Sequence, residues 1–291
     1  MKSFLNCIAP LLCGSHDSME RQRFSRSYIL TKKELGKSKY GSVYITVRKE
    51  DNRSVAVKKV KSNQKLNVEN EINFLSLVND INGCIKMLDY YKIGNKFWIV
   101  MEYPPESITL KDFLSQNKCL SEYRVANIFR HIVITVLEMK HAGVAHRSLR
   151  CENILIDKND RIKIVDFSIA AEFDKADEKL GYVDWELNIT IDPVTTWSLG
   201  IILGALLIGK DPYDFIKNYH PRAIKHEIFK KLMDSKISSL SQDLLRNCLD
   251  LDSLKRPSAS EILQRHWLDV SYHPTEDRYE SRDCWCCPSG F

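Results

Sequence analysis

The sequence predicts an α+β protein with two lobes, a small β-rich lobe followed by a larger helical lobe. Within 28–103, short runs alternate apolar and polar side chains around turn residues, which is typical of half-buried strands. Beyond this range the apolar residues recur with the period of a helix. The proline pair Pro104-Pro105 marks the change of pattern. We therefore expect lobes over 28–103 and 104–269.

The first lobe is expected to hold strands on both sides of one helix. The helix is expected over 69–78, because Ile72, Leu75 and Val78 fall on one helical face. The strands are expected over 28–30, 41–47, 54–60, 85–88 and 97–101.

The second lobe is expected to be mainly helical. Its apolar residues follow the 3.6-residue period in six separate runs. The helices are expected over 110–116, 122–141, 195–208, 224–233, 239–248 and 260–267.

Composition is that of an ordinary globular protein. The chain has 291 residues, of which 44% are hydrophobic and 28% charged, so it can bury a core without metal or disulfide staples. A net charge of +5, from 43 basic and 38 acidic residues, is too mild to indicate a nucleic-acid partner. No apolar run reaches the roughly 20 residues that cross a bilayer, so no transmembrane segment is expected.

Cysteine usage favours a reducing compartment. Of the nine cysteines, Cys84, Cys119, Cys151 and Cys248 lie singly in periodic segments and are expected to be buried free thiols. A cytoplasmic location follows. An export signal over 1–14 is the alternative, although Asn6 and Pro10 would interrupt it.

The two ends of the chain are expected to be tails. Residues 1–27 are expected to be a flexible N-terminal tail. Residues 270–291 form a cysteine-containing tail, in which Cys284-Trp285-Cys286-Cys287 indicates acylation or membrane association. A terminus without regular structure is the alternative.

Four motifs occur in order along the chain. A glycine-rich turn, Leu35-Gly36-Lys37-Ser38-Lys39-Tyr40-Gly41-Ser42-Val43, precedes a strand lysine in Val55-Ala56-Val57-Lys58. Then follow His146-Arg147-Ser148-Leu149-Arg150-Cys151-Glu152-Asn153 and Ile164-Val165-Asp166-Phe167-Ser168. This set resembles the G-x-G-x-x-G-x-V, V-A-I-K, H-R-D-x-K-x-x-N and D-F-G motifs of eukaryotic-type serine/threonine protein kinases. The segment Met101-Glu102-Tyr103-Pro104 is similar to the hinge of the Pim branch.

The resemblance implies a bilobal protein-kinase-like fold that uses ATP and Mg²⁺ to transfer phosphate. Lys58 would contact the α- and β-phosphates and be held by Glu71, because Glu69 points to another helix face. Asn153 and Asp166 would bind the metal, and Arg150 would keep the charge of the loop lysine near the transferred phosphate. The remaining nucleotide contacts would come from Leu35, Gly36, Gly41, Val43, Ala56 and Glu102. Lys59, next to Lys58, is expected to be a solvated charge on the opposite face of its strand.

Ser148 stands where the family has its catalytic aspartate. A hydroxyl cannot accept a proton at neutral pH as a carboxylate does, and a positioned general base contributes about 10²–10⁴-fold. Nucleotide binding is expected to be weak as well, because Pro104 has no N–H to donate to adenine. Ser38 replaces the middle glycine of the glycine-rich turn. Ser168 replaces the glycine of D-F-G and restricts the backbone there.

The segment that follows Phe167 also departs from the family. It is short, and the threonine that normally precedes A-P-E is absent, although Glu186 and Arg256 match the usual ion pair of this region. Thr195 replaces an aspartate that braces the catalytic loop in relatives. We hypothesise that Arg147 pairs with one of the carboxylates of this segment. A solvated acidic loop is the alternative. The carboxylates concerned are Asp174, Asp177 and Glu178.

These features predict a pseudokinase that binds ATP–Mg²⁺ weakly and serves as a scaffold or competitor in phosphorylation signalling. Its partners would then be a nucleotide and another protein. A slow but active serine/threonine kinase, with a protein substrate, is the first alternative, because phosphoryl transfer needs little covalent help from the protein. An interaction module that binds no nucleotide is the second.

Overall fold

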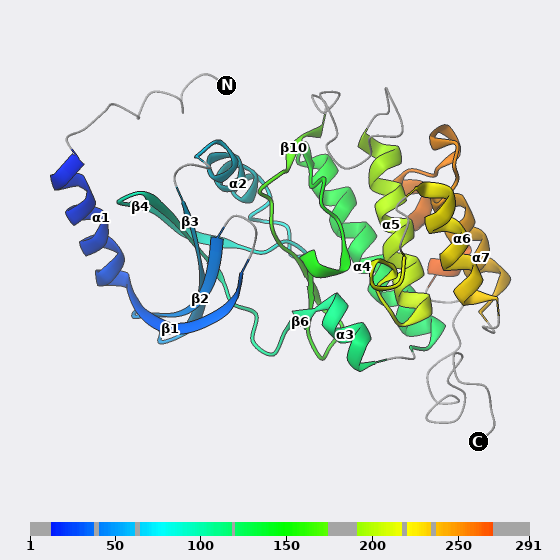
Figure 1. The fold of residues 1–291 in the computed structure, drawn as a ribbon, viewed down its shortest axis with the longest axis horizontal. Coiled ribbons are helices and arrows are strands. Elements are labelled where there is room, and N and C mark those ends of the chain that lie inside the picture. The colour runs from blue at the N-terminus through cyan, green and yellow to red at the C-terminus, as the bar shows by residue number, and fades with distance from the viewer. Residues whose placement is uncertain are drawn as a thin grey trace. The chain divides into compact units, whose positions relative to one another are not determined.

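The computed structural model describes residues 13–37, 41–61, 65–117, 120–173, 191–216, 220–233 and 237–269. The chain forms two compact units. Unit 1 comprises residues up to Ser76 together with Lys86–Tyr103, and unit 2 comprises Leu77–Ile85 and the residues from Pro104 onward. Unit 1 is rich in strands and unit 2 in helices, as the α+β prediction requires (Figure 1).

Unit 1 is built on a five-stranded antiparallel sheet with the strand order β1-β2-β3-β5-β4. The central strand β3 is buried along most of its length and supplies Val55, Val57 and Val60 to the core. Such β-branched side chains suit a pleated surface that is covered on both faces. The elements are β1 (Tyr28–Lys37), β2 (Gly41–Arg48), β3 (Ser54–Lys61), α2 (Lys65–Leu77), β4 (Met87–Ile93) and β5 (Lys96–Glu102).

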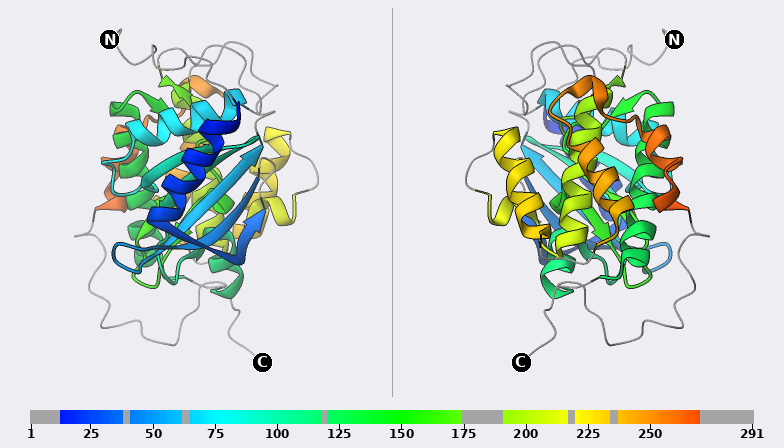
Figure 2. Two further views of the ribbon diagram at one scale, coloured as in Figure 1. Left: turned by 90° about the vertical axis from the view of Figure 1, so that its left-hand side faces the viewer. Right: turned by 90° about the vertical axis from the view of Figure 1, so that its right-hand side faces the viewer.

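Residues expected to be a flexible tail instead form helix α1 (Cys13–Ser27), which lies across the sheet (Figure 2). Phe24 is its buried anchor, with ring centroids 4.9 Å from Trp98 and 5.3 Å from Tyr91. Arg23 donates to Asp89 on β4 at 2.7 Å, and Asp17 accepts the Gly94 N–H at 3.1 Å. The helix escaped prediction because a single buried aromatic residue leaves no apolar periodicity to detect.

Unit 2 holds the other helices and two small sheets. The helices are α3 (Leu110–Gln116), α4 (Glu122–His141), α5 (Ile191–Ile208), α6 (Pro221–Leu232), α7 (Ser239–Cys248) and α8 (Ala259–Leu263). The first sheet joins β6 (Ile108–Thr109), β8 (Ile154–Ile156) and β9 (Ile162–Ile164), and the second joins β7 (Val144–Ala145) and β10 (Ala171–Glu172). Short 3₁₀ turns are η2 (Cys151–Asn153), η4 (Pro212–Asp214), η5 (Ser253–Lys255) and η6 (His266–Leu268).

Helix starts are fixed by polar caps that the sequence already contains. Thr109, Ser121 and Ser238 each accept a backbone N–H from the first turn of the helix that follows. The predicted bounds of α3, α4 and α7 are confirmed. The helix expected over 260–267 ends at Leu263 instead, because Arg265 is extended and a 3₁₀ turn follows.

Helix α5 is the apolar centre of unit 2. By length and composition it could cross a membrane, but 61% of it is buried inside the protein. It packs against α4, α6 and α7, which accounts for its apolar character. Gly200 allows the approach of α7, since a Cβ there would lie 2.7 Å from a Leu249 methyl group. Among the helices of the described ranges, no other has the length and composition to span a bilayer.

The segment Leu77–Ile85 was expected in the first lobe but is part of unit 2. Ile85 donates its N–H to the Ile164 carbonyl at 2.9 Å, and Ile164 donates to the Gly83 carbonyl at 2.7 Å. These bonds pair the segment with β9, and Cys84, which lies within it, is buried. Cys151 and Cys248 are likewise buried free thiols, as predicted, whereas Cys119 lies outside the described residues.

Candidate functional site

Lys58 and Glu71 form a buried ion pair within unit 1. The Lys58 Nζ lies 2.6 Å from the Glu71 Oε1, and the two side chains are only 4% and 2% exposed. Strand β3 supplies the lysine and helix α2 the carboxylate. Charges removed from water in this way depend on each other, because neither can be left unpaired without a large desolvation cost. The pair holds the Lys58 ammonium in a fixed place.

Lys59 departs from its expected role as a solvated charge. Its ammonium lies 4.1 Å from the Trp98 ring centroid and 4.6 Å from that of Tyr44. Strand alternation places it on the face opposite Lys58, where aromatic side chains from β2 and β5 flank it. Partial burial lowers the pKa of Lys59. The prediction missed this because cross-strand neighbours cannot be assigned before the register is known.

The glycine-rich turn joins β1 to β2. Gly41 cannot be replaced without displacing backbone, since a Cβ there would lie 2.1 Å from the Lys59 carbonyl oxygen. At Gly36 a Cβ would meet nothing within 4 Å, so the backbone faces open space there. Such bare backbone can approach a phosphate closely. Val43 is paired with Lys58 across β2 and β3. Ser38 lies outside the described residues.

Three further residues that were predicted to contact nucleotide belong to unit 1. Leu35 is 41% exposed on β1, whereas Ala56 is buried on β3. Glu102, the last residue of β5, donates its N–H to the Lys86 carbonyl at 2.9 Å and accepts the Lys86 N–H on its carboxylate at 3.0 Å. The end of this strand is therefore fixed next to Pro104, which has no amide hydrogen to offer.

His146 organises the loop that carries Ser148 in unit 2. Its Nδ1 accepts the Ser148 N–H at 3.2 Å, so the proton is on Nε2, which donates to the Val165 carbonyl at 3.0 Å. Its ring also meets the Phe167 ring at a centroid distance of 4.8 Å. Burial lowers the pKa of His146 to about 4 and keeps the ring neutral. The imidazole thus connects the Ser148 loop to the Asp166 segment.

Asn153 connects the same two segments, one through its side-chain amide and the other through its backbone carbonyl. Its Nδ2 donates to the Ser148 carbonyl at 2.8 Å and to the Ser148 Oγ at 3.0 Å. Its backbone carbonyl accepts the Val165 N–H at 2.9 Å. With both donated bonds directed to Ser148, the amide oxygen is the atom that can serve a cation.

Asp166 is held in an uncommon backbone conformation. Its φ is 67°, and that of Arg147 is 61°. Left-handed backbone at residues other than glycine costs of order 1–3 kcal/mol and persists only where surrounding contacts impose it. Here those contacts are the bonds of His146 and Asn153 to Val165. The Asp166 carboxylate and the Asn153 amide oxygen are the hard oxygen donors that Mg²⁺ prefers, together with phosphate and water.

Arg150, expected near the transferred phosphate, forms an ion pair with Glu152. Glu152 also accepts from Lys111 at 3.1 Å, and Lys111 lies 3.0 Å from Asp214. The side chains form a chain of alternating charges along α3, η2 and η4. The charge of Arg150 is thereby partly neutralised before any ligand is present.

The expected contacts of the acidic segment fall largely outside the described residues. Asp174, Asp177, Glu178 and Glu186 all lie in that part of the chain. Arg147 is half-buried, which lowers its pKa. Arg256 donates to the carbonyls of Asp250 at 2.8 Å and Pro193 at 3.0 Å and stacks on Trp197. The carboxylate pairings proposed for these two arginines remain predictions.

Lys140 makes two contacts that could not be predicted from the sequence. Its ammonium forms an ion pair with Asp192, the acidic residue in the first turn of α5, and lies 4.9 Å from the Phe173 ring centroid. Phe173 in turn donates its N–H to the Gly143 carbonyl at 2.8 Å. One lysine at the end of α4 therefore contacts both the residue after β10 and the start of α5.

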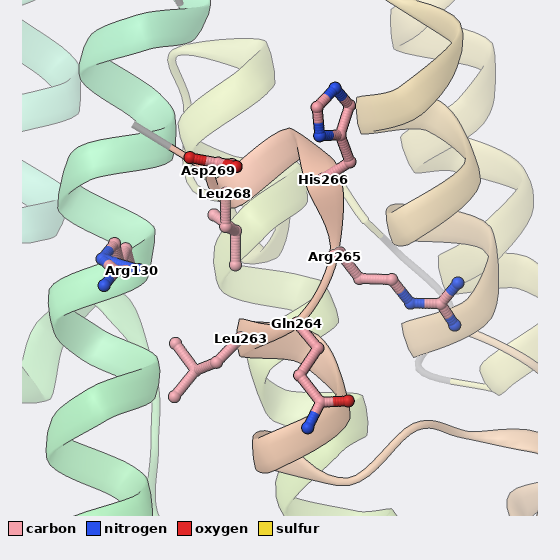
Figure 3. A pocket seen from close by; sticks show the side chains of 7 residues that line it. All are labelled: Arg130, Leu263, Gln264, Arg265, His266, Leu268 and Asp269. Atoms are coloured by element: carbon pink, nitrogen blue, oxygen red, sulfur yellow. The ribbon is translucent and has the colours of Figure 1, made fainter. Parts of the chain in front are cut away.

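A separate hollow of about 300 Å³ lies in unit 2, between α4 and the segment formed by the end of α8 and the residues after it (Figure 3). None of the predicted site residues belongs to it. Its lining is mainly polar and comprises Arg130, Leu263, Gln264, Arg265, His266, Leu268 and Asp269.

Comparison with known proteins decides the family. Residues 29–268 match the protein kinase domain. The chain belongs to the protein kinase domain family. The predicted α+β bilobal kinase fold is therefore confirmed, and helix α1 precedes the matched region. Members of the family in general use ATP and Mg²⁺.

The chain is similar to several serine/threonine kinases. It is 31% identical over 280 residues to "Serine/threonine-protein kinase prk-2" of Caenorhabditis elegans, covering 89% of this chain and 62% of that protein. It is 31% identical over 255 residues to "Probable serine/threonine-protein kinase KIN1 homolog" of Enterocytozoon bieneusi (strain H348), covering 82% and 42%. It is 27% identical over 284 residues to "Serine/threonine-protein kinase pim-2" of Danio rerio, covering 85% and 86%. The chain thus spans less than two thirds of the first two relatives.

Proposed function

We propose that this protein is a kinase-domain protein that binds ATP–Mg²⁺ weakly, transfers phosphate poorly or not at all, and acts in phosphorylation signalling through its bound partners. Lys58, held by Glu71, would contact the α- and β-phosphates. Asn153 and Asp166 would hold the metal, which when bound neutralises charge on the phosphates. Pro104 offers no amide hydrogen to adenine, and losing one hydrogen bond costs roughly 0.5–1.5 kcal/mol.

The observation that carries the proposal is the environment of Ser148. Its Oγ accepts a hydrogen bond from Asn153, and its backbone N–H is bound to His146. The loop is therefore ordered as a catalytic loop would be, yet it presents a hydroxyl where a base is needed. A missing general base accounts for about 10²–10⁴ in rate, which is roughly 3–5 kcal/mol of barrier.

A slow serine/threonine kinase is the second candidate, and the Lys58–Glu71 pair favours it. That pair is formed in this structure at 2.6 Å, and Asp166 is held by ordered neighbours. Phosphoryl transfer depends mainly on positioning and electrostatics rather than on covalent chemistry. Lys58 and Asp166, which would position the phosphates and the metal, are therefore retained, whereas the proton acceptor is absent.

Single-turnover phosphorylation of a serine- and threonine-containing peptide mixture separates the two candidates. We expect Ser148→Asp to raise the rate about 10²–10⁴-fold above the wild type, since it restores the base. Asp166→Asn on the Ser148→Asp background is the matched control and should abolish the gained rate. A wild-type rate ordinary for kinases, about 1–100 s⁻¹, that Asp166→Asn silences would contradict impaired transfer.

A gain in Ser148→Asp with slow wild-type turnover supports the second candidate. Undetectable wild-type transfer with retained ATP binding supports a protein that acts through its partners, and a gain in Ser148→Asp would then show that only the base was missing. No ATP binding in either variant would leave an interaction module without nucleotide and contradict the proposal.

A further inference from the structure

Helix α6 carries a continuous basic stripe on its outer side. Arg222, His226 and Lys230 are spaced by four residues, so they lie one above another on the same helical face. All three are exposed, and the His226 side chain is 72% exposed. The stripe runs along about 12 Å of helix, at a rise of about 1.5 Å per residue.

The charge of this stripe is not balanced within the described parts of the chain. Neither Arg222 nor Lys230 forms an ion pair with a described residue, and the nearby Glu227 is engaged with the His226 ring at 3.5 Å. Lys230 lies in the last turn of α6, where a cation interacts favourably with the helix dipole, whereas Arg222 lies in the first turn, where it does not.

An apolar contact point continues the stripe at its C-terminal end. Met233, the C-cap residue of α6, is 79% exposed. Methionine is among the residue types that are most often buried. Half-buried Phe229 lies one helical turn before Met233, and the guanidinium of Arg246 lies 5.0 Å from the centroid of its ring. Methionine adapts its shape to different apolar partners.

The opposite face of α6 decides between possible partners. Ile224, Ile228 and Leu232 are buried in unit 2, where the helix packs on α5 (Figure 1). A helix that lies in a membrane surface needs such an apolar face free for the lipid. Because this face is already occupied, the stripe suits a protein partner better than a bilayer.

We propose that the α6 stripe docks an acidic segment of another protein. Arg222 and Lys230 are about 12 Å apart along the helix, with His226 midway between them, and this span matches carboxylates four residues apart on an extended chain, at about 13 Å. An apolar residue just beyond the last carboxylate would contact Met233. This docking is independent of nucleotide and of Ser148, so it can succeed or fail separately from the proposed function.

Fluorescence anisotropy of a labelled peptide, Glu-Thr-Glu-Thr-Glu-Thr-Leu, tests the docking with the full chain at low salt. We expect the double variant Arg222→Glu/Lys230→Glu to bind about tenfold more weakly than the wild type, since each altered pair changes sign. The matched control is Lys210→Glu/Arg265→Glu, which makes the same change in net charge at two exposed sites elsewhere in unit 2. It should bind within twofold of the wild type.

The sign of the interaction can be reversed to exclude simple misfolding. A peptide with lysines in place of the glutamates should bind the Arg222→Glu/Lys230→Glu variant and not the wild type. Equal loss in the control variant, or no binding of the acidic peptide by the wild type, would overturn the proposal. So would binding to phosphatidylserine vesicles that the α6 variant loses while peptide binding stays unchanged.

Discussion

The His146 imidazole is neutral because burial lowers its pKa from 6.5 to about 4. The unfolded chain therefore binds a proton between these two values that the folded chain excludes. The contribution of His146 to the free energy of unfolding is fully present above pH 6.5. It decreases as the pH falls from 6.5 to 4, by at most about 3 kcal/mol in all. Protonation would also put a hydrogen on Nδ1, which accepts the Ser148 N–H.

We expect His146→Gln to flatten the pH dependence of stability between pH 6.5 and 4, since glutamine cannot take up this proton. Chemical denaturation at a series of pH values measures the slope. The variant His141→Gln, at an exposed position on α4, should keep the wild-type slope. Identical slopes in all three proteins would show that His146 titrates normally.

The Lys58–Glu71 pair has a consequence for any experiment that removes Lys58. Lys58→Met leaves the Glu71 carboxylate buried without its cation, which costs about 3–5 kcal/mol. We expect this variant to be markedly less stable in urea denaturation, apart from any loss of nucleotide binding. Lys58→Met/Glu71→Leu should recover much of the loss, because the stranded charge is gone. If the double variant is less stable than the single one, the pair is not the cause.

Among the elements, α1 is an addition that stabilises the sheet of unit 1. Phe24 is 3% exposed and packs among Tyr28, Tyr91 and Trp98. We expect Phe24→Ala to reduce the free energy of unfolding by about 3–5 kcal/mol, as for other buried aromatic residues. Met19→Ala on the same helix, where the side chain is 68% exposed, should change it by at most about 0.5 kcal/mol. Thermal and urea unfolding of both variants measure the difference.

The elements that could be predicted from sequence are those with a strong local signal. The runs that became α3, α4 and α7 combine apolar period with a Thr or Ser cap, so their bounds were correct. Helix α1 has only Phe24 as a buried anchor, and its contacts reach residues more than 60 positions away, such as Asp89. No local pattern contains that information.

The same distinction holds within the candidate site. Motif spacing and the family resemblance predict Lys58, Glu71, Asn153 and Asp166 as site residues, and of their expected contacts the structure confirms the ion pair between Lys58 and Glu71. They could not show that Arg150 is paired with Glu152, that Lys59 is flanked by aromatic rings, or that Lys140 contacts Asp192. Those contacts depend on register and tertiary packing, which one sequence does not specify.

At the scale of the whole molecule, bound nucleotide should raise stability. At ten times its dissociation constant, a ligand that binds only the folded state adds about 1.4 kcal/mol, or a few degrees in melting temperature for a chain of this size. We expect ATP with Mg²⁺ to produce this shift in the full chain only at millimolar concentration. Asp166→Asn should reduce the part that requires magnesium. A full shift at micromolar ATP would contradict weak binding.

The chain leaves unit 1 after Ser76, contributes Leu77–Ile85 to unit 2, and returns to unit 1 at Lys86. During synthesis on the ribosome, the segment holding Gly83 and Ile85 emerges long before Ile164, its hydrogen-bond partner on β9. Unit 2 therefore cannot be completed by the C-terminal part of the chain alone. A fragment beginning at Pro104 would lack a neighbour that β9 requires, and genetic separation of the two halves at that proline should yield poorly folded products.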